Sequence, residues 1–364
     1  MATRRAAHFC AAMAGAFLAP GLASAGELQQ LYRSTRIEAM GGASTALADD
    51  DSALYLNPAG LAGIERLQFN YLVTDISVST DVVATVSDLA KAFSKLSGSS
   101  LNLLLGKNIY AEAQIAPNLI GPGFGFSVLA DQQLAIHAEN RALPQINLGY
   151  QTTDGFQLGY ATSVGRGKRS LFGKRAELRV GVAGKMLFRR GGYRKLSPVT
   201  LFQLVNPSSL QQLIGPWGSG LGLDVGSQFV FEANSLLTLY AGLAMTDVGD
   251  TNFGDGPDPI KANLSGGFAA RYKLGAIHFK GIYDQRHILH VTDWRKKNHF
   301  GVEVELPMIS LFAGINQVYP TYGMSFDAWI VKVTAASFVE EQGSFVYQDP
   351  ERRWMLRLAL KFDL

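Results

Sequence analysis

The chain has 364 residues, of which 47% are hydrophobic and 17% charged, and its 33 basic and 30 acidic side chains leave a net charge of +3. This near balance gives no electrostatic indication of nucleic acid binding, and the apolar content excludes a disordered chain. The charged fraction is low, and the chain has 39 glycines. No apolar run approaches the ~20 residues that a membrane-spanning helix needs. Two classes of protein fit these features. These are a large soluble β-rich protein and a transmembrane β-barrel.

The first 25 residues have the composition of an export signal. Arg4 and Arg5 precede an apolar, alanine-rich stretch from Phe9 to Leu22, and Ala23-Ser24-Ala25 supplies a small-residue cleavage pattern. We therefore expect a signal peptide over 1–25. The single cysteine, Cys10, lies within it, so the mature chain has no thiol for catalysis, zinc binding or disulfides.

Residues 26–66, ahead of the first predicted strand, carry the most specific motif of the chain. Small side chains around Gly41 and Gly42 permit close packing in a crowded space, and Asp50 or Asp51 can cap a short turn that Pro58 ends. The amide of Asn57 can bond backbone groups of a folded-in segment. The residues of this motif are Gly41, Gly42, Asp49, Asp50, Asn57, Pro58 and Ala59.

Two stretches interrupt a β pattern that otherwise runs from residue 67 to the end. Val82–Leu105 has apolar residues at helical spacing with charges between them, and Ser197-Pro198 provides a cap and a first-turn proline before Val199–Ile214. We expect amphipathic helices near 82–105 and 197–214, in long loops. Their apolar faces would cover an opening or the outer membrane interface.

The β pattern itself has a period of two. In residues 354–364 every even position is large and apolar, while the odd positions include Arg357 and Lys361. A helix would scatter these charges around its circumference, whereas a strand places them on one face. Glu177–Arg189 and His299–Leu306 alternate in the same way, so both are predicted strands.

Short turn signals and longer connectors separate the predicted strands. The turns include Thr153-Asp154-Gly155, Glu232-Ala233-Asn234, Lys273-Leu274-Gly275 and Pro307-Met308, and the longer connectors include Asp247–Lys261 and Arg286–Asn298. Tight periplasmic turns and longer outer loops are typical of a transmembrane barrel. A soluble sandwich would carry more charge. We therefore predict an all-β protein, with a transmembrane antiparallel β-barrel over 67–364.

The strand count follows from the topology, because both termini of such a barrel face the periplasm and the number of strands is then even. Ten crossings follow from Glu177 onward. Four precede it, near Leu67–Thr80, Ala116–Ala130, Leu134–Tyr150 and Gly155–Val164. This predicts fourteen strands, and an alternative with sixteen divides Ile109–Tyr150 differently.

The N-terminal motif resembles the hatch of the outer-membrane long-chain fatty acid transporter family, the FadL/TodX-like barrels. The shared features are the Gly41-Gly42 stretch, Ala48-Asp49-Asp50 and Asn57-Pro58-Ala59 just ahead of the first strand. The sequences Met40-Gly41-Gly42 and Asn57-Pro58-Ala59-Gly60-Leu61 are also similar to those of PorV-like barrels associated with type IX secretion. The resemblance implies a fourteen-stranded barrel plugged by the hatch over 26–66, an apolar ligand pocket and a lateral opening in the wall.

Candidate chemistry is sparse. His287 and His290, flanked by Asp284 and Asp293, could suggest a metal site, but an outer-loop polar cluster is the favoured interpretation. The mature chain has no Gly-x-Ser-x-Gly elbow. We predict a protein that is not an enzyme and has no metal and no cofactor.

Basic side chains in the hatch and on the predicted inner faces could contact a carboxylate-bearing ligand. Alternatively, and by preference, they pair across the lumen or hold the plug by salt bridges. These residues are Arg33, Arg36, Arg179, Lys185 and Arg357.

The predicted function is passive uptake of hydrophobic small molecules, such as long-chain fatty acids, across the bacterial outer membrane. The expected surroundings are outer-membrane lipid and lipopolysaccharide, and the expected ligand is a hydrophobic small molecule. The alternative is a scaffold barrel that docks a secreted or cell-surface protein through its outer loops. No nucleic acid partner is expected.

Overall fold

The computed structural model of the chain describes residues 30–83, 106–139, 145–164, 175–196, 214–254 and 256–363. The signal peptide predicted over 1–25 lies outside these residues, and so do nearly all of the helices predicted near 82–105 and 197–214. In the described part of the chain, no helix is long and apolar enough to cross a membrane.

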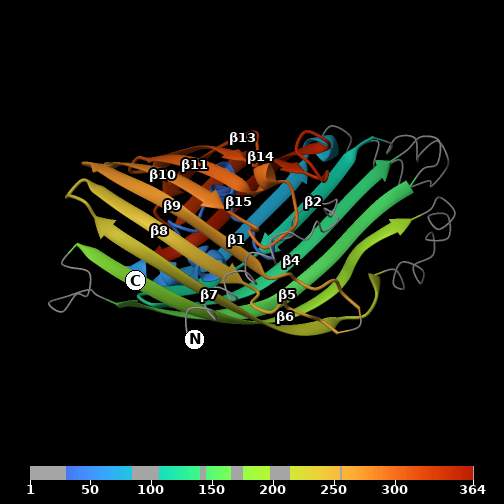
Figure 1. The fold of residues 1–364 in the computed structure, drawn as a ribbon, viewed down its shortest axis with the longest axis horizontal. Helices are drawn as coiled ribbons and strands as arrows, with labels where there is room; N and C mark the ends of the chain where they lie inside the picture. Colours follow the sequence, from blue (N-terminus) through green and yellow to red (C-terminus); the bar gives the residue numbers. More distant parts are fainter. Residues whose placement is uncertain are drawn as a thin grey trace, which may run out of the picture.

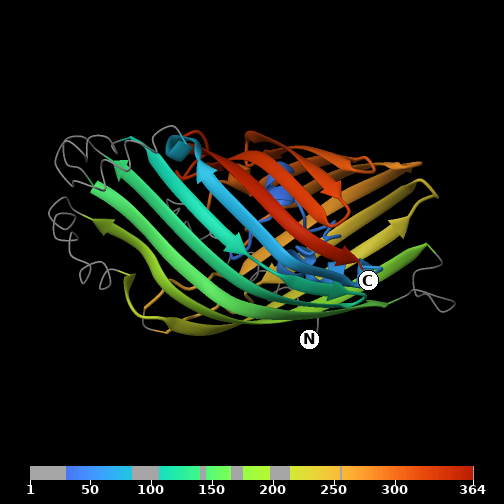
Figure 2. The same ribbon diagram turned by 180° about the vertical axis from the view of Figure 1, so that it is seen from behind.

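The described strands form one closed antiparallel sheet (Figure 1). The strands are β1 (Gln68–Ser79), β2 (Asn108–Ile115), β3 (Asn118–Gly121), β4 (Phe124–Glu139), β5 (Gln145–Val164), β6 (Ala176–Leu196), β7 (Gly218–Glu232), β8 (Leu237–Thr246), β9 (Asn263–Leu274), β10 (Ile277–Gln285), β11 (Asn298–Glu305), β12 (Ile309–Asn316), β13 (Tyr319–Ala328), β14 (Val331–Glu341) and β15 (Pro350–Asp363). β15 pairs with β1 from Gln68↔Asp363 to Ser79↔Arg353 and closes the barrel. From behind, these two strands lie side by side (Figure 2).

The chain crosses the barrel fourteen times, as predicted, because β2 and β3 are two parts of one crossing. Both lie between β1 and β4, and they are separated at Ala116-Pro117. Pro117 has no N–H to donate to a neighbouring strand, which accounts for the interruption. The alternative with sixteen strands is therefore wrong.

Two predicted strand boundaries before residue 177 are also wrong. A hairpin turn with Gly123 at φ 81° divides the strand predicted over 116–130, and Thr153-Asp154-Gly155 lies inside the continuous strand β5. Gly155 packs against β6, where a Cβ atom would lie 2.3 Å from the carbonyl oxygen of Met186. The glycine there serves close strand packing and not a turn.

Connections of two kinds lie at the two ends of the barrel. Five of those at the end that holds the C-terminus are short: 122–123, 233–236, 275–276, 306–308 and 329–330, whereas 165–175, between β5 and β6, is longer. At the other end, 317–318 is short, whereas 247–262, 286–297 and 342–349 are longer, and 286–297 contains the 3-10 helix η2 (Trp294–Lys297). We call these the short-turn end and the long-loop end. β5 and β6, with 20 and 21 residues, exceed the ~10 residues that a membrane crossing needs.

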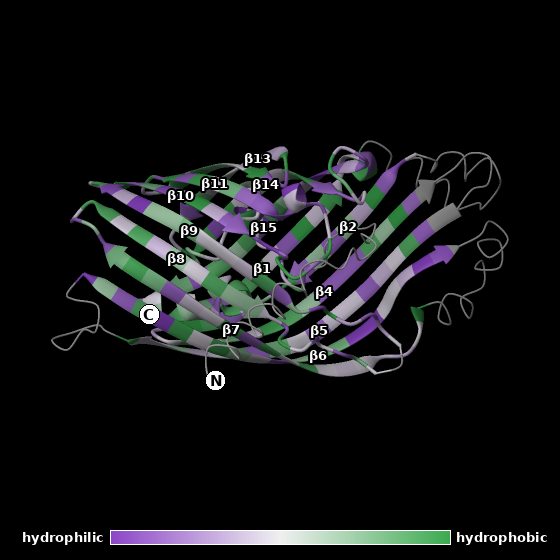
Figure 3. Ribbon diagram, in the orientation of Figure 1, coloured by the Kyte–Doolittle hydropathy of each residue, from purple (hydrophilic) through white to green (hydrophobic). Residues whose placement is uncertain are grey.

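Hydrophobic and hydrophilic residues alternate along the strands of the wall (Figure 3). On β15, Trp354, Leu356 and Phe362 are 44–51% exposed. Arg353 and Arg357, at the alternate positions, are each at most 6% exposed. The predicted alternation is thus present, with the charged positions turned to the lumen. An apolar belt of this kind is the lipid-facing surface of a membrane barrel.

Residues 30–66, here called the N-terminal segment, lie inside the barrel (Figure 1). The segment contains α2 (Thr35–Ala39), α3 (Ala53–Leu56) and the 3-10 helix η1 (Pro58–Gly63). α2 packs on β12 to β15, while η1 packs on the inner faces of β4 to β7. The segment therefore spans the lumen from one wall to the opposite wall.

Two apolar clusters fix this placement. Met40 and Leu47 of the segment are buried with Phe312 and Phe338 of the wall. Leu54 and Leu61 are buried with a second group of wall residues that includes Ile120 and Leu129. Burial of several large side chains on each side accounts for the stable position of a segment with little regular structure.

Candidate functional site

The N-terminal segment and the wall around it form the candidate site, and their backbones meet at Gly41. Gly41 and Gly42 have φ angles of 68° and 81°, a region that side chains with a Cβ rarely adopt. A Cβ atom on Gly41 would lie 2.5 Å from the carbonyl oxygen of Phe300 and 2.6 Å from that of Ile315. The segment touches β11 and β12 here with no room for a side chain.

Asn57-Pro58-Ala59 joins the segment to β6 and β7. The Asn57 amide donates to the carbonyl oxygens of Thr45 and Ser227, at 2.7 Å and 3.2 Å, and its oxygen accepts from the Ala59 N–H at 3.2 Å. Pro58 and Ala59 lie against Gly181, where a Cβ atom would lie 2.4 Å from the carbonyl carbon of Pro58. Asn57 thus links two turns of the segment to each other and to the wall.

A wall carboxylate holds the middle of the segment. Oδ2 of Asp284 on β10 accepts hydrogen bonds from the backbone N–H groups of Ser44 and Thr45, both at 2.6 Å. On β7, the Gln228 amide donates to the carbonyl oxygen of Ala46 at 2.7 Å. These side chains satisfy backbone groups of a non-helical stretch, which would otherwise be buried without partners.

The three consecutive acids of the segment each face a basic side chain. Nη1 of Arg36 lies 2.9 Å from both Asp49 and Asp50, and Arg36 also contacts Glu303 on β11. Asp49 also pairs with wall cations, Arg271 on β9 and Lys280 on β10. The segment is therefore fastened to β9, β10 and β11 by a connected group of charges.

Arg357 on β15 completes this group on the other side. It contacts Asp51 of the segment, donates to the Tyr32 hydroxyl at 2.9 Å and lies 3.5 Å from Asp75 on β1. We call the contacts of Asp49, Asp50 and Asp51 with Arg36, Arg271, Lys280 and Arg357 the ionic latch.

The latch shifts the titration of its acids. Burial by itself would raise the pKa of Asp49, but Arg36, together with Lys280 and Arg271, outweighs burial and holds that pKa well below its usual range. The pKa of Asp50 is lowered in the same way, since Arg36 outweighs the effect of burial. Both carboxylates therefore remain charged under mildly acidic conditions.

The five cations proposed from sequence as carboxylate contacts all face the lumen but do not form one patch. Arg36 and Arg357 line the short-turn side of the segment, and Arg179 packs beside Gly63. Arg33 and Lys185 lie elsewhere, Lys185 toward the long-loop side. Each of the five contacts carboxylates of the protein itself: Arg33 meets Glu38, Glu112 and Glu340; Arg179 meets Glu177; Lys185 meets Asp224 and Asp247.

Cavities lie on both sides of the segment. The one at the short-turn end has about 490 Å³, and charged side chains line it, including Asp49, Asp50, Arg271, Lys332 and Glu305. The one on the long-loop side has about 40 Å³, and Leu31, Tyr32, Leu56 and Ile260 contribute its apolar lining. The segment thus separates a polar vestibule from a small, partly apolar space.

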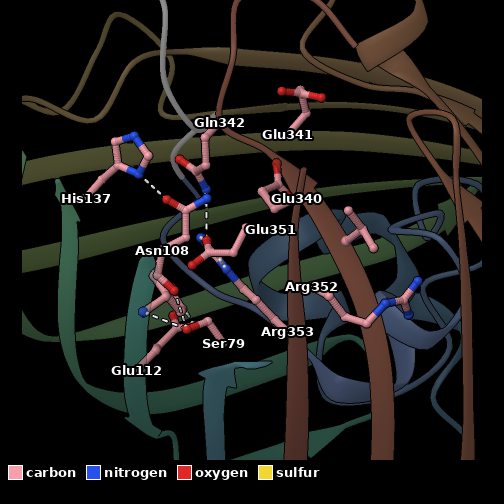
Figure 4. A network of polar contacts seen from close by, with 12 residues as sticks. Ser79, Asn108, Glu112, His137, Glu340, Glu341, Gln342, Glu351, Arg352 and Arg353 are labelled. Atoms are coloured by element: carbon pink, nitrogen blue, oxygen red, sulfur yellow. Dashed lines mark hydrogen bonds and ion pairs between the residues drawn. The ribbon is translucent and has the colours of Figure 1, made fainter. Parts of the chain in front are cut away.

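A network of polar contacts closes the long-loop side between β2, β14 and β15 (Figure 4). Arg353 is fully buried, with its guanidinium 3.3 Å from the ring centre of Tyr110 and bonded to Glu351. Glu341 accepts from the backbone N–H groups of Gly343 and Asp349, at 2.8 Å and 2.7 Å. Sequence reasoning missed this network, although the charged residues on both sides of 342–349 were a signal for it.

The predicted polar cluster at 284–293 is divided by the fold. Asp284 holds the segment, while Asp293 pairs with Arg295. The rings of His287 and His290 lie 5.3 Å apart and edge to face. Among the described residues, no group of three or more His, Cys, Asp or Glu side chains is arranged to hold a metal ion.

Comparison with known proteins gives structural similarity alone. No family model matches the chain, and no curated protein matches it. Similar solved structures include the TodX deltaS2S3 mutant monoaromatic hydrocarbon channel, 11% identical, covering 91% of this chain and 98% of that one, with a TM-score of 0.48. The P. putida toluene transporter TodX is 12% identical, with 92% and 99% covered and a TM-score of 0.45.

A Pseudomonas aeruginosa FadL homologue is 9% identical, with 93% of this chain and all of that chain covered and a TM-score of 0.30. These neighbours come from the group of barrels that the N-terminal motif resembles. With TM-scores below 0.5, none of these likenesses is extended to this chain.

Proposed function

We propose that this chain is a gated barrel of the bacterial outer membrane that lets hydrophobic small molecules pass inward without an energy source. The N-terminal segment is its hatch. The observation that carries the proposal is the position of that segment, which spans the lumen between the vestibule and the long-loop side. Passage through the barrel therefore requires the segment to move.

The size of the long-loop cavity supports a gated mechanism. An apolar cavity of about 150 Å³ is needed to hold a molecule such as benzene. The space beside Tyr32 and Leu56 has about 40 Å³, so it is too small for a hydrophobic cargo while the segment is in place. In our proposal, a ligand enters from the long-loop end and displaces this part of the segment as it binds.

The chemistry of the cargo rests on the resemblance of the hatch motif and on the apolar part of this cavity lining. The more specific proposal is that long-chain fatty acids are the cargo. Charged side chains dominate the lining of the vestibule, so exit through the wall, as the resemblance implies, is the route that we favour.

Uptake measurements test the proposal. Radiolabelled toluene and oleate would be supplied to cells carrying the parent chain, no chain, a deletion of residues 30–60 or Asn57→Ala. We expect uptake above the null strain with the parent, and altered uptake with both variants. Asn252→Ala, at an exposed position of loop 247–262, is the matched control. Identical uptake in the parent and the null strain would exclude transport of these compounds.

A cysteine lock provides a second arm, because the single cysteine of the chain, Cys10, precedes the described residues. The side-chain oxygens of Thr35 in the segment and Asp75 in β1 lie 2.6 Å apart. Joining Thr35→Cys and Asp75→Cys by a disulfide should block uptake, and a reductant should restore it. The single variants control for the loss of the native hydrogen bond.

A second candidate function is docking of a secreted or cell-surface protein. Loops 286–297 and 342–349 are fastened together, since Lys296 donates to the carbonyl oxygen of Gly343 at 2.8 Å. They expose a group of large apolar side chains: Leu289, Val291, Trp294, Phe345 and Tyr347. Exposed apolar groups of this kind favour a partner surface. Stoichiometric recovery of a protein with the parent, and its loss with Trp294→Ser, would support docking.

A further inference from the structure

A row of polar side chains crosses the inner wall on the long-loop side of the N-terminal segment. Gln114 on β2 is in register with Asp131 on β4, Asp131 with Thr153 on β5, and Thr153 with Arg189 on β6. Gln151 lies two residues before Thr153 on β5, on the same face of the strand. Directly paired residues on one face have Cβ atoms about 5 Å apart, so these side chains form one surface.

Three buried oxygens of this surface lack a hydrogen-bond donor among the described residues. They are Oε1 of Gln114, Oδ1 of Asp131 and Oε1 of Gln151. Their residues are 1%, 1% and 4% exposed. Buried polar atoms of folded proteins are nearly all hydrogen-bonded, so unpartnered oxygens on three adjacent strands indicate that another molecule supplies the donors.

The other atoms of these residues are fixed by contacts. The Gln133 amide donates to Oδ2 of Asp131 at 3.0 Å and to Glu112 at 3.1 Å, which leaves Oδ1 of Asp131 unbonded. The Gln114 amide donates to the carbonyl oxygen of Leu31 at 3.3 Å. The oxygens are therefore held in place beside the first described residues of the segment, where its displacement would uncover them.

The basic side chains of the lumen, unlike these oxygens, already have partners. The five basic residues that could meet a ligand carboxylate all contact protein carboxylates, as described above. Arg189, at the end of the row, bonds Thr153 at 3.0 Å and the carbonyl oxygen of Asp258 at 3.2 Å. A carboxylate ligand would have to compete for groups that are already engaged, whereas a donor group would meet free acceptors.

We propose that Gln114, Asp131 and Gln151 form a binding site for a primary ammonium group, and that the barrel selects amphipathic amines over amphipathic carboxylates. This inference rests on the proposed uptake function and names the class of its substrate. An ammonium group has three N–H donors, which match the three acceptor oxygens.

Binding of four matched probes to the purified full chain tests the site. They are 2-phenylethylamine, 2-phenylethanol, 3-phenylpropanoate and ethylbenzene, which share a hydrophobic body and differ in the polar group. Calorimetry with the parent should give affinity for the amine at least about tenfold above that for the carboxylate, the size of one charge-assisted hydrogen bond. Asp131→Asn and, separately, Gln151→Leu should weaken amine binding by about tenfold and leave ethylbenzene unchanged.

The control variant is Asp154→Asn, an acid on β5 whose side chain points to the other face from Thr153. It should bind all four probes as the parent does. The shift in gel migration on heating, which folded barrels show, verifies that each variant is folded.

The outcomes separate this inference from the proposed function. Equal binding of amine and carboxylate, or equal loss of all four probes in Asp131→Asn, overturns the ammonium site and indicates that water fills it. Uptake of ethylbenzene above the null strain would then still support transport. If no probe enters cells above the level of the null strain, the transport proposal is rejected. Selective binding of the amine that depends on Asp131 would then still support the ammonium site.

Discussion

The guanidinium of Arg357, on the last strand of the barrel, contacts the carboxylate of Asp51, in the segment that precedes the first strand. These residues are 306 positions apart in sequence, and both are almost entirely shielded from solvent. Charged pairs in such surroundings are costly to break, because removal of one partner leaves the other charge buried and uncompensated.

Arg357→Ala should therefore destabilise the segment and the barrel by about 3–5 kcal/mol, since it leaves Asp51 and Asp75 without their cation. Urea unfolding of the purified protein measures this difference. Lys361→Ala is the control on the same strand face. Its ion pair with Asp327 is partly exposed, so a change of at most about 1 kcal/mol is expected. Equal effects of the two variants would mean that Arg357 does not fasten the segment.

The ionic latch predicts a loss of stability in acid. The pKa of Asp49 is held well below the value of about 3.9 that it has in an unfolded chain. As the pH falls below about 4, the unfolded state therefore binds more protons than the folded state, and the free energy of unfolding decreases. The contribution is present above pH 4 and is lost as the pH falls through the folded pKa.

Asp49→Asn tests this linkage. The variant should be less stable than the parent at pH 7, and the difference should shrink between pH 4 and pH 2. Urea unfolding at several pH values gives both curves. Parallel curves for parent and variant would contradict the assignment.

Gly41→Ala should disturb the segment more than an ordinary glycine substitution does. Its positive φ angle alone costs a residue with a Cβ about 1–3 kcal/mol, and the Cβ would also overlap the carbonyl oxygens of Phe300 and Ile315. Gly281→Ala on β10, where no atom lies within 4 Å of the added Cβ, should be nearly neutral. Thermal unfolding compares the two, and a neutral Gly41→Ala would show that the segment lies elsewhere.

Glu341→Ala should release loop 342–349 from the wall. The carboxylate accepts hydrogen bonds from Gly343, Asp349 and the Tyr319 hydroxyl, and its removal leaves these donors unpaired. We expect faster cleavage by chymotrypsin at Phe345 or Tyr347, which are exposed on this loop. Glu232→Ala, at an exposed turn of the short-turn end, should leave the cleavage rate unchanged.

Much of the barrel could be predicted from alternation alone. A lipid-facing wall requires apolar residues at every second position, so the strand from Pro350 to Asp363 and the inward position of Arg357 follow from local sequence. Turn residues were less reliable. Gly123, inside a predicted strand, reverses the chain, whereas Gly155, in a predicted turn, packs against β6. The contact that distinguishes Gly155 lies in the neighbouring strand.

The partners inside the lumen could not be predicted in this way. Asp49 was visible as part of a motif, but its contacts with Arg271 and Lys280 join residues more than 200 positions apart. The sequence placed Asp284 in a polar cluster with two histidines, but its carboxylate accepts hydrogen bonds from the backbone of the segment. Register around the barrel decides these contacts, and no local pattern encodes it.

The meeting of β1 and β15 has a consequence for assembly. Asp75 and Arg357 are register partners across this junction, and Asp51 of the segment shares the same guanidinium. The last strand to be made thus closes against the first around a segment that is already in position. A barrel closed without the segment would leave Arg357 lacking one of its two acidic partners, so the segment contributes to the stability of the junction that closes the wall.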